Sequence, residues 1–122
     1  MTKAFFGCAV ATALAAFAAP SAAFAQDSYN REVVIENAGN SAIYFIYFSH
    51  SDDDHWGDDR LGEEEVVEAG ATRLFDFNDG SGECVFDVQA TFENGETVEL
   101  YEVNVCGVST LDANEQRMWI EE

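Results

Sequence analysis

An acidic stretch holds the densest group of side chains that could do chemistry in this sequence. Residues 52–65 contain five Asp and three Glu among fourteen residues. Crowded carboxylates repel one another, and a hard cation with a preference for oxygen ligands relieves that repulsion. The spacing from Asp52 matches a twelve-residue calcium loop with Gly57 at its sharp turn. The sequence therefore predicts a site for Ca²⁺ or another hard cation, with the ligands Asp52, Asp54, Asp58, Asp59 and Glu63.

This stretch differs from an EF-hand in three respects. Trp56 stands at a ligand position, and Asp59 stands where an apolar residue is usual. The residues before Asp52 have the pattern of a strand where an EF-hand has a helix. A calcium-type loop on a β-scaffold is one interpretation, and a solvated acidic surface of the kind found in salt-adapted proteins is the other. His50 and His55, beside the same carboxylates, are also candidate ligands for Zn²⁺ or copper.

A tryptophan inside an acidic loop needs its own explanation. Trp56 is interpreted as a packing anchor that holds the loop against the body of the protein. The functional alternative is a stacking platform for a sugar ring. Four other aromatic residues would extend such a platform: Tyr44, Tyr47, Tyr101 and Trp119.

Short strands are the elements that must position this loop. The segment 42–49 is apolar on both faces, which predicts a central strand. Asn94-Gly95 predicts a tight two-residue hairpin turn. We therefore predict an all-β fold, a single antiparallel β-sandwich of six to seven short strands. The expected strands are 31–37, 42–49, 71–77, 84–92, 97–106 and 118–120.

The beginning of the chain has the three parts of a secretory signal peptide. Lys3 gives a basic start, residues 4–25 are uncharged, and Ala23-Phe24-Ala25 has the form of a cleavage site. A transmembrane anchor, the alternative, fits poorly with the alanine-rich composition and with Pro20. We predict a periplasmic or secreted protein. The predicted parts are 1–25, the signal peptide, and 26–122, an acidic β-sandwich domain.

Two cysteines, Cys84 and Cys106, remain after the predicted cleavage. An oxidising compartment would pair them, and the loop that they close predicts a stabilisation of roughly 3 kcal/mol. A two-residue turn at Asn94-Gly95 places Phe86 opposite Val103. The disulfide then requires a bend or β-bulge between Val103 and Cys106.

The charge balance excludes several classes of partner. The chain has 24 Asp and Glu against five Lys and Arg, a formal net charge of −19. Such a surface repels the phosphates of nucleic acids and an anionic membrane, so we predict neither nucleic-acid binding nor membrane contact after cleavage. The same surface favours a basic protein partner.

The predicted domain has no visible catalytic arrangement. Both of its histidines lie in one loop, its cysteines are expected to be oxidised, and no phosphate-binding glycine motif or His-Glu-x-x-His occurs. We predict a non-enzymatic module that binds a hard cation through the loop 52–63. The alternative is an interaction or inhibitor-type protein that binds a basic partner through its negative surface.

Two short motifs resemble those of a group of small exported bacterial proteins. Residues 56–62 follow the pattern W-G-x-D-x-L-G, and residues 84–87 follow C-x-[YF]-D. Ala69-Gly70 and Asn94-Gly95 match the group's remaining features. The resemblance implies a shared fold unit and an exported location. It also implies that Asp59 caps the loop by accepting backbone N–H bonds, and that the loop is anchored by Trp56, Gly57 and Asp87.

Overall fold

The structure, a computed structural model, describes residues 29–121. The predicted signal peptide, 1–25, lies outside the described residues. All strands of the described part belong to one compact unit, which comprises Tyr29–Asp79 and Glu83–Glu122. Within the described part, no helix has the length and apolar character needed to cross a membrane.

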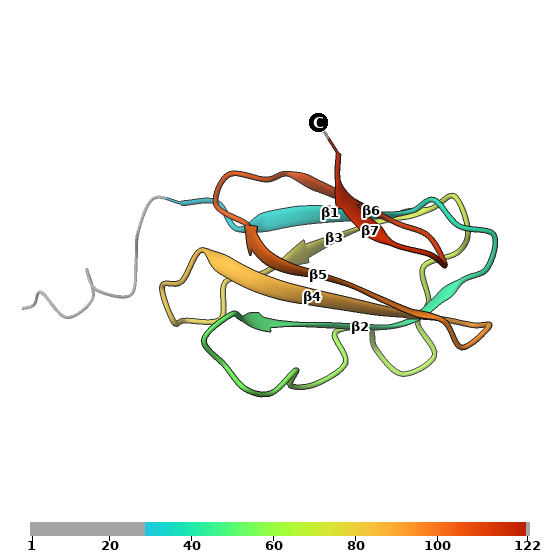
Figure 1. The fold of residues 1–122 in the computed structure, drawn as a ribbon, viewed down its shortest axis with the longest axis horizontal. Helices are drawn as coiled ribbons and strands as arrows, with labels where there is room; N and C mark the ends of the chain where they lie inside the picture. The colour runs from blue at the N-terminus through green and yellow to red at the C-terminus, as the bar shows by residue number, and fades with distance from the viewer. Residues whose placement is uncertain (1–28, 122) are drawn as a thin grey trace, which may run out of the picture. The chain divides into compact units, whose positions relative to one another are not determined.

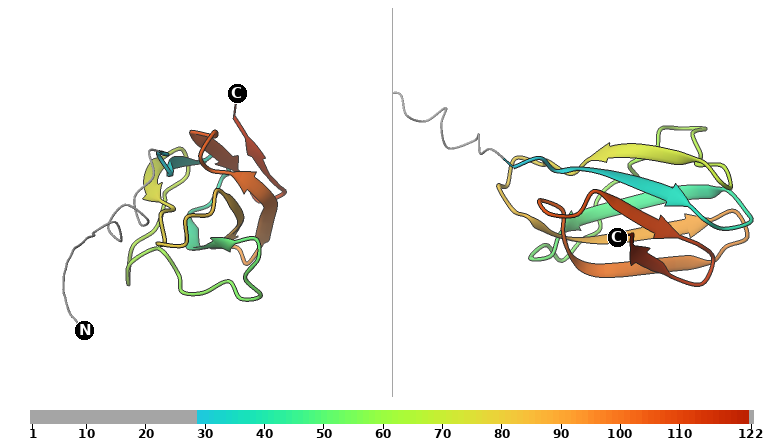
Figure 2. Two further views of the ribbon diagram at one scale, coloured as in Figure 1. Left: turned by 90° about the vertical axis from the view of Figure 1, so that its left-hand side faces the viewer. Right: turned by 90° about the horizontal axis from the view of Figure 1, so that it is seen from above.

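Seven strands form two sheets in the described residues (Figure 1). The strands are β1 (Glu32–Asn37), β2 (Ile43–His50), β3 (Thr72–Asp76), β4 (Val85–Phe92), β5 (Thr97–Asn104), β6 (Thr110–Ala113) and β7 (Met118–Ile120). One sheet has the order β3-β1-β6-β7, and the other has the order β2-β4-β5. The sheets face each other across a shared core (Figure 2). The predicted all-β sandwich is confirmed, with β7 as the expected last edge strand.

One pair of strands departs from the antiparallel arrangement of the rest of the sandwich. β1 runs parallel to β6, and their register places Ile35 beside Leu111. Parallel neighbours require a crossover connection, and here the crossover is the chain that forms β2 to β5. β6 itself was not expected from the sequence, because its four residues, which include Asp112, have no clear alternation.

The core consists of inward-facing residues at alternate positions along the strands. Phe48 of β2 stacks on Phe77, which follows β3, with the ring centroids 3.7 Å apart. Phe86 of β4 meets Phe77 edge to face at 5.5 Å. The alternation expected around β3 is confirmed, since Phe75 and Phe77 are buried and Leu74 is 56% exposed. These rings join the two sheets.

β2 is an edge strand, so the prediction of a central strand is wrong. Its register with β4 shifts between Ile43 and Phe45, which marks a β-bulge. The bulge turns two consecutive aromatic residues outward, and Tyr44 and Phe45 are 39% and 42% exposed. The apolar character of both faces therefore reflects an outward aromatic surface rather than burial on both sides.

The hairpin between β4 and β5 also differs from the predicted geometry. Gly95 N donates to Phe92 O, and Phe92 N donates to Glu96 O, so the turn has three loop residues instead of two. Gly95 has a φ of 92°, which a residue without a side chain adopts at low cost. A second register shift, between Phe86 and Val88, restores the predicted pairing of Phe86 with Val103.

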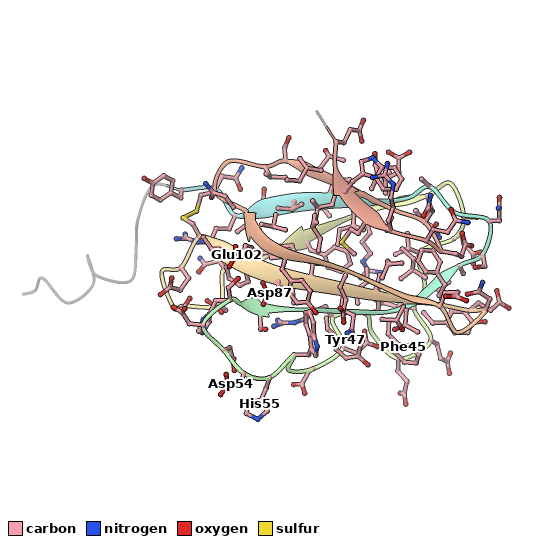
Figure 3. All side chains as sticks on the ribbon, in the orientation of Figure 1. Phe45, Tyr47, Asp54, His55, Asp87 and Glu102 are labelled. Carbon is pink, nitrogen blue, oxygen red and sulfur yellow. A yellow bond between two sulfur atoms is a disulfide. The ribbon has the colours of Figure 1, made fainter. Side chains whose placement is uncertain are left out.

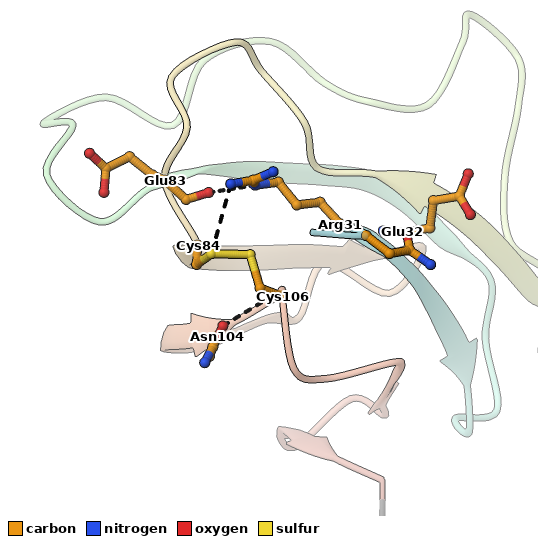
Figure 4. The surroundings of a disulfide bond; sticks show 7 residues. Arg31, Glu32, Glu83, Cys84, Asn104 and Cys106 are labelled. Atoms are coloured by element: carbon orange, nitrogen blue, oxygen red, sulfur yellow. Dashed lines mark hydrogen bonds between the residues drawn. A yellow bond between two sulfur atoms is a disulfide. The ribbon is translucent and has the colours of Figure 1, made fainter. Parts of the chain in front are cut away.

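The predicted disulfide is present. The sulfur atoms of Cys84 and Cys106 are 2.04 Å apart and the Cα atoms 5.3 Å apart. β5 ends at Asn104, and the following turn carries Cys106 toward Cys84, so the expected bend is confirmed (Figure 4). Beside the disulfide, the buried Arg31 donates from Nε to Glu83 O at 2.7 Å. This bond joins the segment before β1 to the segment before β4.

Candidate functional site

The segment from Asp59 to Val67 covers the free edge of β2. Oδ1 of Asp59 accepts a hydrogen bond from Ile46 N at 3.0 Å and another from Leu61 N at 3.1 Å. Further along, Ile43 and Val67 exchange backbone hydrogen bonds of 2.8 and 3.0 Å. An uncovered edge strand would offer its polar groups to another chain. The capping role that the resemblance implies for Asp59 thus has a direct geometric counterpart.

The remaining residues of the motif fasten the same segment. Leu61 is buried in the core. The guanidinium of Arg60 lies 4.2 Å from the centroid of the Phe48 ring and donates to Phe48 O at 2.7 Å. Gly57 has a φ of 81°, which explains a glycine after the tryptophan. The pattern W-G-x-D-x-L-G therefore describes a covered sheet edge.

Asp87 supports a second irregular point, where the register of β4 and β5 shifts. Its Oδ1 accepts from Ser51 Oγ at 2.7 Å and from Glu102 N at 2.9 Å. Glu102 has a φ of 58°, an uncommon conformation for a residue with a side chain. Figure 3 shows Asp87 and Glu102 close to each other. Asp87 thus ties the acidic loop to the bulge in β5.

Trp56 lies half-buried against the outward side of the three-stranded sheet. Its ring centroid is 6.2 Å from that of Tyr101 on β5, with the ring planes tilted by 38°. The indole is therefore placed as the predicted anchor would be. Trp119 belongs to the other sheet, so it does not extend an aromatic platform around Trp56.

A small cavity of about 170 Å³, which we name the acidic pocket, lies beside this aromatic pair. Its lining includes Asp53, Asp54, His55, Trp56, Asp87 and Tyr101. His55 Nδ1 lies 3.6 Å from Asp53 Oδ1, and Figure 3 shows His55 on the acidic loop. The Tyr101 hydroxyl donates to Glu99 Oε1 at 2.6 Å, and this bond raises the pKa of Tyr101. The pocket thus combines aromatic faces with negative charge.

A second hollow, of about 470 Å³, lies at the other end of β2. Tyr44, Phe45 and the run Glu63–Glu65 contribute to its lining. Phe45 stacks on Tyr47 with the ring centroids 6.4 Å apart, and both rings are labelled in Figure 3. The charge of Glu93 raises the pKa of Tyr44.

Glu65 is held on the rim of that second hollow. The hydrogen bond from Gly62 N, followed by the ion pair with Arg73 at 2.7 Å, lowers the pKa of Glu65. Aromatic and acidic residues therefore occur together at both ends of β2.

The five predicted metal ligands do not gather around one point. Asp59 is committed to the backbone of β2, Asp54 lines the acidic pocket, and Glu63 lines the second hollow. Asp52 and Asp58 are exposed on the loop between them. His50 packs edge to face on Phe86, whereas the exposed His55 lies beside Asp53.

Within residues 29–121, a different group of three acidic residues comes together. One carboxylate oxygen of each lies within 4.8 Å of the other two. The group consists of Glu36, Asp112 and Glu121. Sequence reasoning missed it, because the parallel pairing of β1 with β6 brings together residues that are far apart in the chain. A hydrogen bond with Asp112, together with its charge, raises the pKa of Glu121.

Comparison with known proteins supports the fold alone. No protein-family model matches the chain, and no curated protein matches it. A protein from Eubacterium rectale, whose structure was solved by NMR, is similar with a TM-score of 0.55 and 15% sequence identity. The similarity covers 80% of this chain and 94% of that protein.

Proposed function

We propose that this chain is an exported, non-enzymatic binding module whose acidic pocket receives a basic side chain from a partner protein. The observation that carries this proposal is the lining of the pocket. Trp56 and Tyr101 stand beside the carboxylates of Asp53, Asp54 and Asp87. An ammonium or guanidinium group is attracted both by aromatic faces and by carboxylates.

The size of the pocket and the overall charge support the same conclusion. A volume of about 170 Å³ suits the head of one side chain better than an extended ligand. The net charge of −19 would steer a basic protein toward this surface. The three carboxylates in the same lining favour a cationic group over a neutral sugar ring, the alternative ligand of Trp56, because their hydrogen bonds to a charged donor are stronger.

Export and the lack of catalysis are parts of this proposal. The signal-peptide pattern of residues 1–25 supports export, and so does the Cys84–Cys106 disulfide, because such bonds persist in oxidising compartments. The non-enzymatic assignment rests on the sequence, in which no nucleophile stands with a base.

A pair of matched peptides tests the pocket. The probes are an acetylated Gly-Arg-Gly amide and the same peptide with neutral citrulline, followed by Trp56 fluorescence in a Trp119→Phe background. We expect the arginine peptide to bind more tightly, and its affinity to fall as salt rises. Asp54→Asn should weaken it by about 2- to 5-fold. Glu96→Gln, which removes the same charge at the β4–β5 turn, should leave it unchanged. Equal binding of both peptides would refute the proposal.

Hard-cation binding by the loop 52–63 is the second candidate. The observation that favours it is that Asp52, Asp54 and Asp58 are exposed on one loop, whose turn is fixed by the bond from Asp53 N to His50 O. Millimolar Ca²⁺ would then raise the melting temperature through this loop. The double variant Asp52→Asn/Asp58→Asn should abolish that rise, and a rise that survives in the variant removes this candidate.

A further inference from the structure

Three carboxylates converge on the outer side of the four-stranded sheet. Glu36 on β1 and Asp112 on β6 are partners in the parallel register, so their side chains leave the same face of the sheet. Glu121 follows β7, and its backbone N donates to Thr110 O at 3.1 Å, which holds it beside β6. One oxygen from each carboxylate lies within 4.8 Å of the other two.

The burial of Asp112 is a second, independent observation that favours a ligand at this cluster. The residue is only 8% exposed. A hydrogen bond links its carboxyl group to Glu121, but its Oδ1 is buried with no hydrogen-bond partner among the described residues. A buried ionised oxygen without a partner is costly, and native structures rarely leave one unsatisfied. Because Asp112 contributes an oxygen to the cluster, its carboxylate is directed toward Glu36 and Glu121.

Within the described part of the chain, no ion pair reaches these three carboxylates. Arg73 pairs with Glu65 and His55 with Asp53, so neither of these groups is bound to the cluster. Arg117 lies on the same strand hairpin, but its guanidinium packs 4.1 Å from the centroid of the Trp119 ring. The three carboxylates therefore face one another without an ion pair to any of them from residues 29–121.

We propose that Glu36, Asp112 and Glu121 bind a hard divalent cation, with a preference for Ca²⁺. Oxygen ligands lie 2.3–2.6 Å from Ca²⁺, so two oxygens on one ion are separated by at most about 5 Å. The oxygens of the cluster lie within that separation. Ca²⁺ accepts flexible, carboxylate-rich geometries, whereas Mg²⁺ demands near-ideal octahedral geometry and usually keeps several waters. An all-oxygen set also disfavours Zn²⁺, which prefers nitrogen and sulfur.

The position of the cluster indicates what the cation would do. β7 is a short edge strand, and Glu121 follows its last residue, Ile120. A cation shared with Glu36 and Asp112 would clamp the end of the chain to β1 and β6. Three carboxylates, one of them exposed, correspond to the weak end of calcium affinity, about 10⁻⁴ to 10⁻³ M, which is typical of extracellular modules.

Thermal melting of the full chain tests this site. CaCl₂ at about ten times the dissociation constant should raise the melting temperature by about 4 to 8 °C. MgCl₂ and NaCl at matched ionic strength should raise it much less. Glu121→Gln should abolish the calcium effect, and it is a safe variant because Glu121 is exposed. Glu32→Gln, a matched charge removal on β1, should preserve the effect.

Terbium luminescence locates the ion independently of stability. Asp112 and Trp119 are register partners on β6 and β7, so Trp119 should sensitise Tb³⁺ bound to the cluster. We expect sensitised emission that Ca²⁺ displaces, and that Trp119→Phe and Glu121→Gln abolish. The proposal is overturned by an unchanged melt, by an equal rise with all three salts, or by loss of binding in Asp52→Asn/Asp58→Asn instead of Glu121→Gln. The last result would place the ion in the loop 52–63.

Discussion

On the open edge of β2, Oδ1 of Asp59 accepts a hydrogen bond from Ile46 N at 3.0 Å. It takes the place of the carbonyl oxygen that a neighbouring strand would supply. The same oxygen also accepts the Leu61 N–H at 3.1 Å. A single carboxylate thus closes the loop on itself and against the sheet. The predictions that follow begin from this contact.

Replacing Asp59 with alanine should destabilise the domain by about 2 to 3 kcal/mol, because two backbone N–H groups lose a charged acceptor. Asp59→Asn should cost less, since its amide oxygen still accepts hydrogen bonds. Urea denaturation measures both. Asp58→Ala, one residue away and exposed, is the control and should change stability by less than about 0.5 kcal/mol. Equal losses in the Asp58 and Asp59 variants would show that the cap contributes nothing.

The backbone conformation of Glu102 predicts which substitutions at this position lower the stability of the domain. Its φ of 58° favours a residue without a β-branched side chain. Glu102→Gly should leave stability within about 1 kcal/mol, whereas Glu102→Val should lower it by about 1 to 2 kcal/mol. Asp87→Ala, which removes the acceptor for Glu102 N and Ser51 Oγ, should also be destabilising. Chemical denaturation would decide, and a Val variant as stable as the Gly variant would contradict the strain.

Removal of the disulfide should lower stability by roughly 3 kcal/mol, because the loop between Cys84 and Cys106 regains its freedom in the unfolded state. The Cys84→Ser/Cys106→Ser variant should therefore melt at a lower temperature, and dithiothreitol should shift the parent protein toward the same value. If reductant leaves the melt of the parent protein unchanged, the bond does not stabilise this fold.

We expect protonation of Glu115 to account for part of the stability that the domain loses in acid. Its carboxylate accepts from Ser41 Oγ at 2.7 Å and from Ser41 N at 2.8 Å, and the Ser41 hydroxyl contributes most to lowering its pKa. A lowered folded pKa means that its contribution is present above the usual pKa of Glu and is lost as pH falls through the folded value. Glu115→Gln should therefore lose less stability than the parent between pH 5 and pH 3, about the range in which carboxyls titrate.

We expect the contribution of Glu121 to stability to change with pH in the opposite direction to that of Glu115. The pKa of Glu121 is raised, first by its hydrogen bond with Asp112, so its ionisation weakens the fold as pH rises. Glu121→Gln should accordingly gain stability relative to the parent at neutral pH in metal-free buffer. Parallel pH profiles for the Glu115 and Glu121 variants would contradict at least one of the two assignments.

The alternation of apolar and polar residues along each strand predicted much of the fold. The pairing of strands that are far apart in the sequence could not be predicted. The faces of β3 followed directly from Leu74, Phe75 and Phe77, because each side chain alternates without interruption. β2 was misplaced because the bulge at Tyr44 puts two aromatic residues on one face, which imitates a strand buried on both sides. The parallel β1–β6 pair has no signal in either segment alone.

In the candidate site, too, local motifs could be predicted from the sequence and long-range arrangements could not. The resemblance implied the capping role of Asp59, and its partner Leu61 lies within the same motif. Its other partner, Ile46, lies on β2 outside the motif and could not be named from the sequence. The density of acids in 52–65 predicted ligands that the fold instead distributes over two hollows. The cluster of Glu36, Asp112 and Glu121 depends on the register of three strands, which no spacing in the sequence reports.

The Cys84–Cys106 bridge closes the open end of the hairpin whose other end is the Asn94-Gly95 turn. β4 and β5 therefore sit in one covalent ring. A protease that nicks the exposed turn opens this ring without releasing either strand, so both pieces would migrate together on a non-reducing gel and separate only after thiol treatment. A single cut at this turn therefore does not divide the molecule.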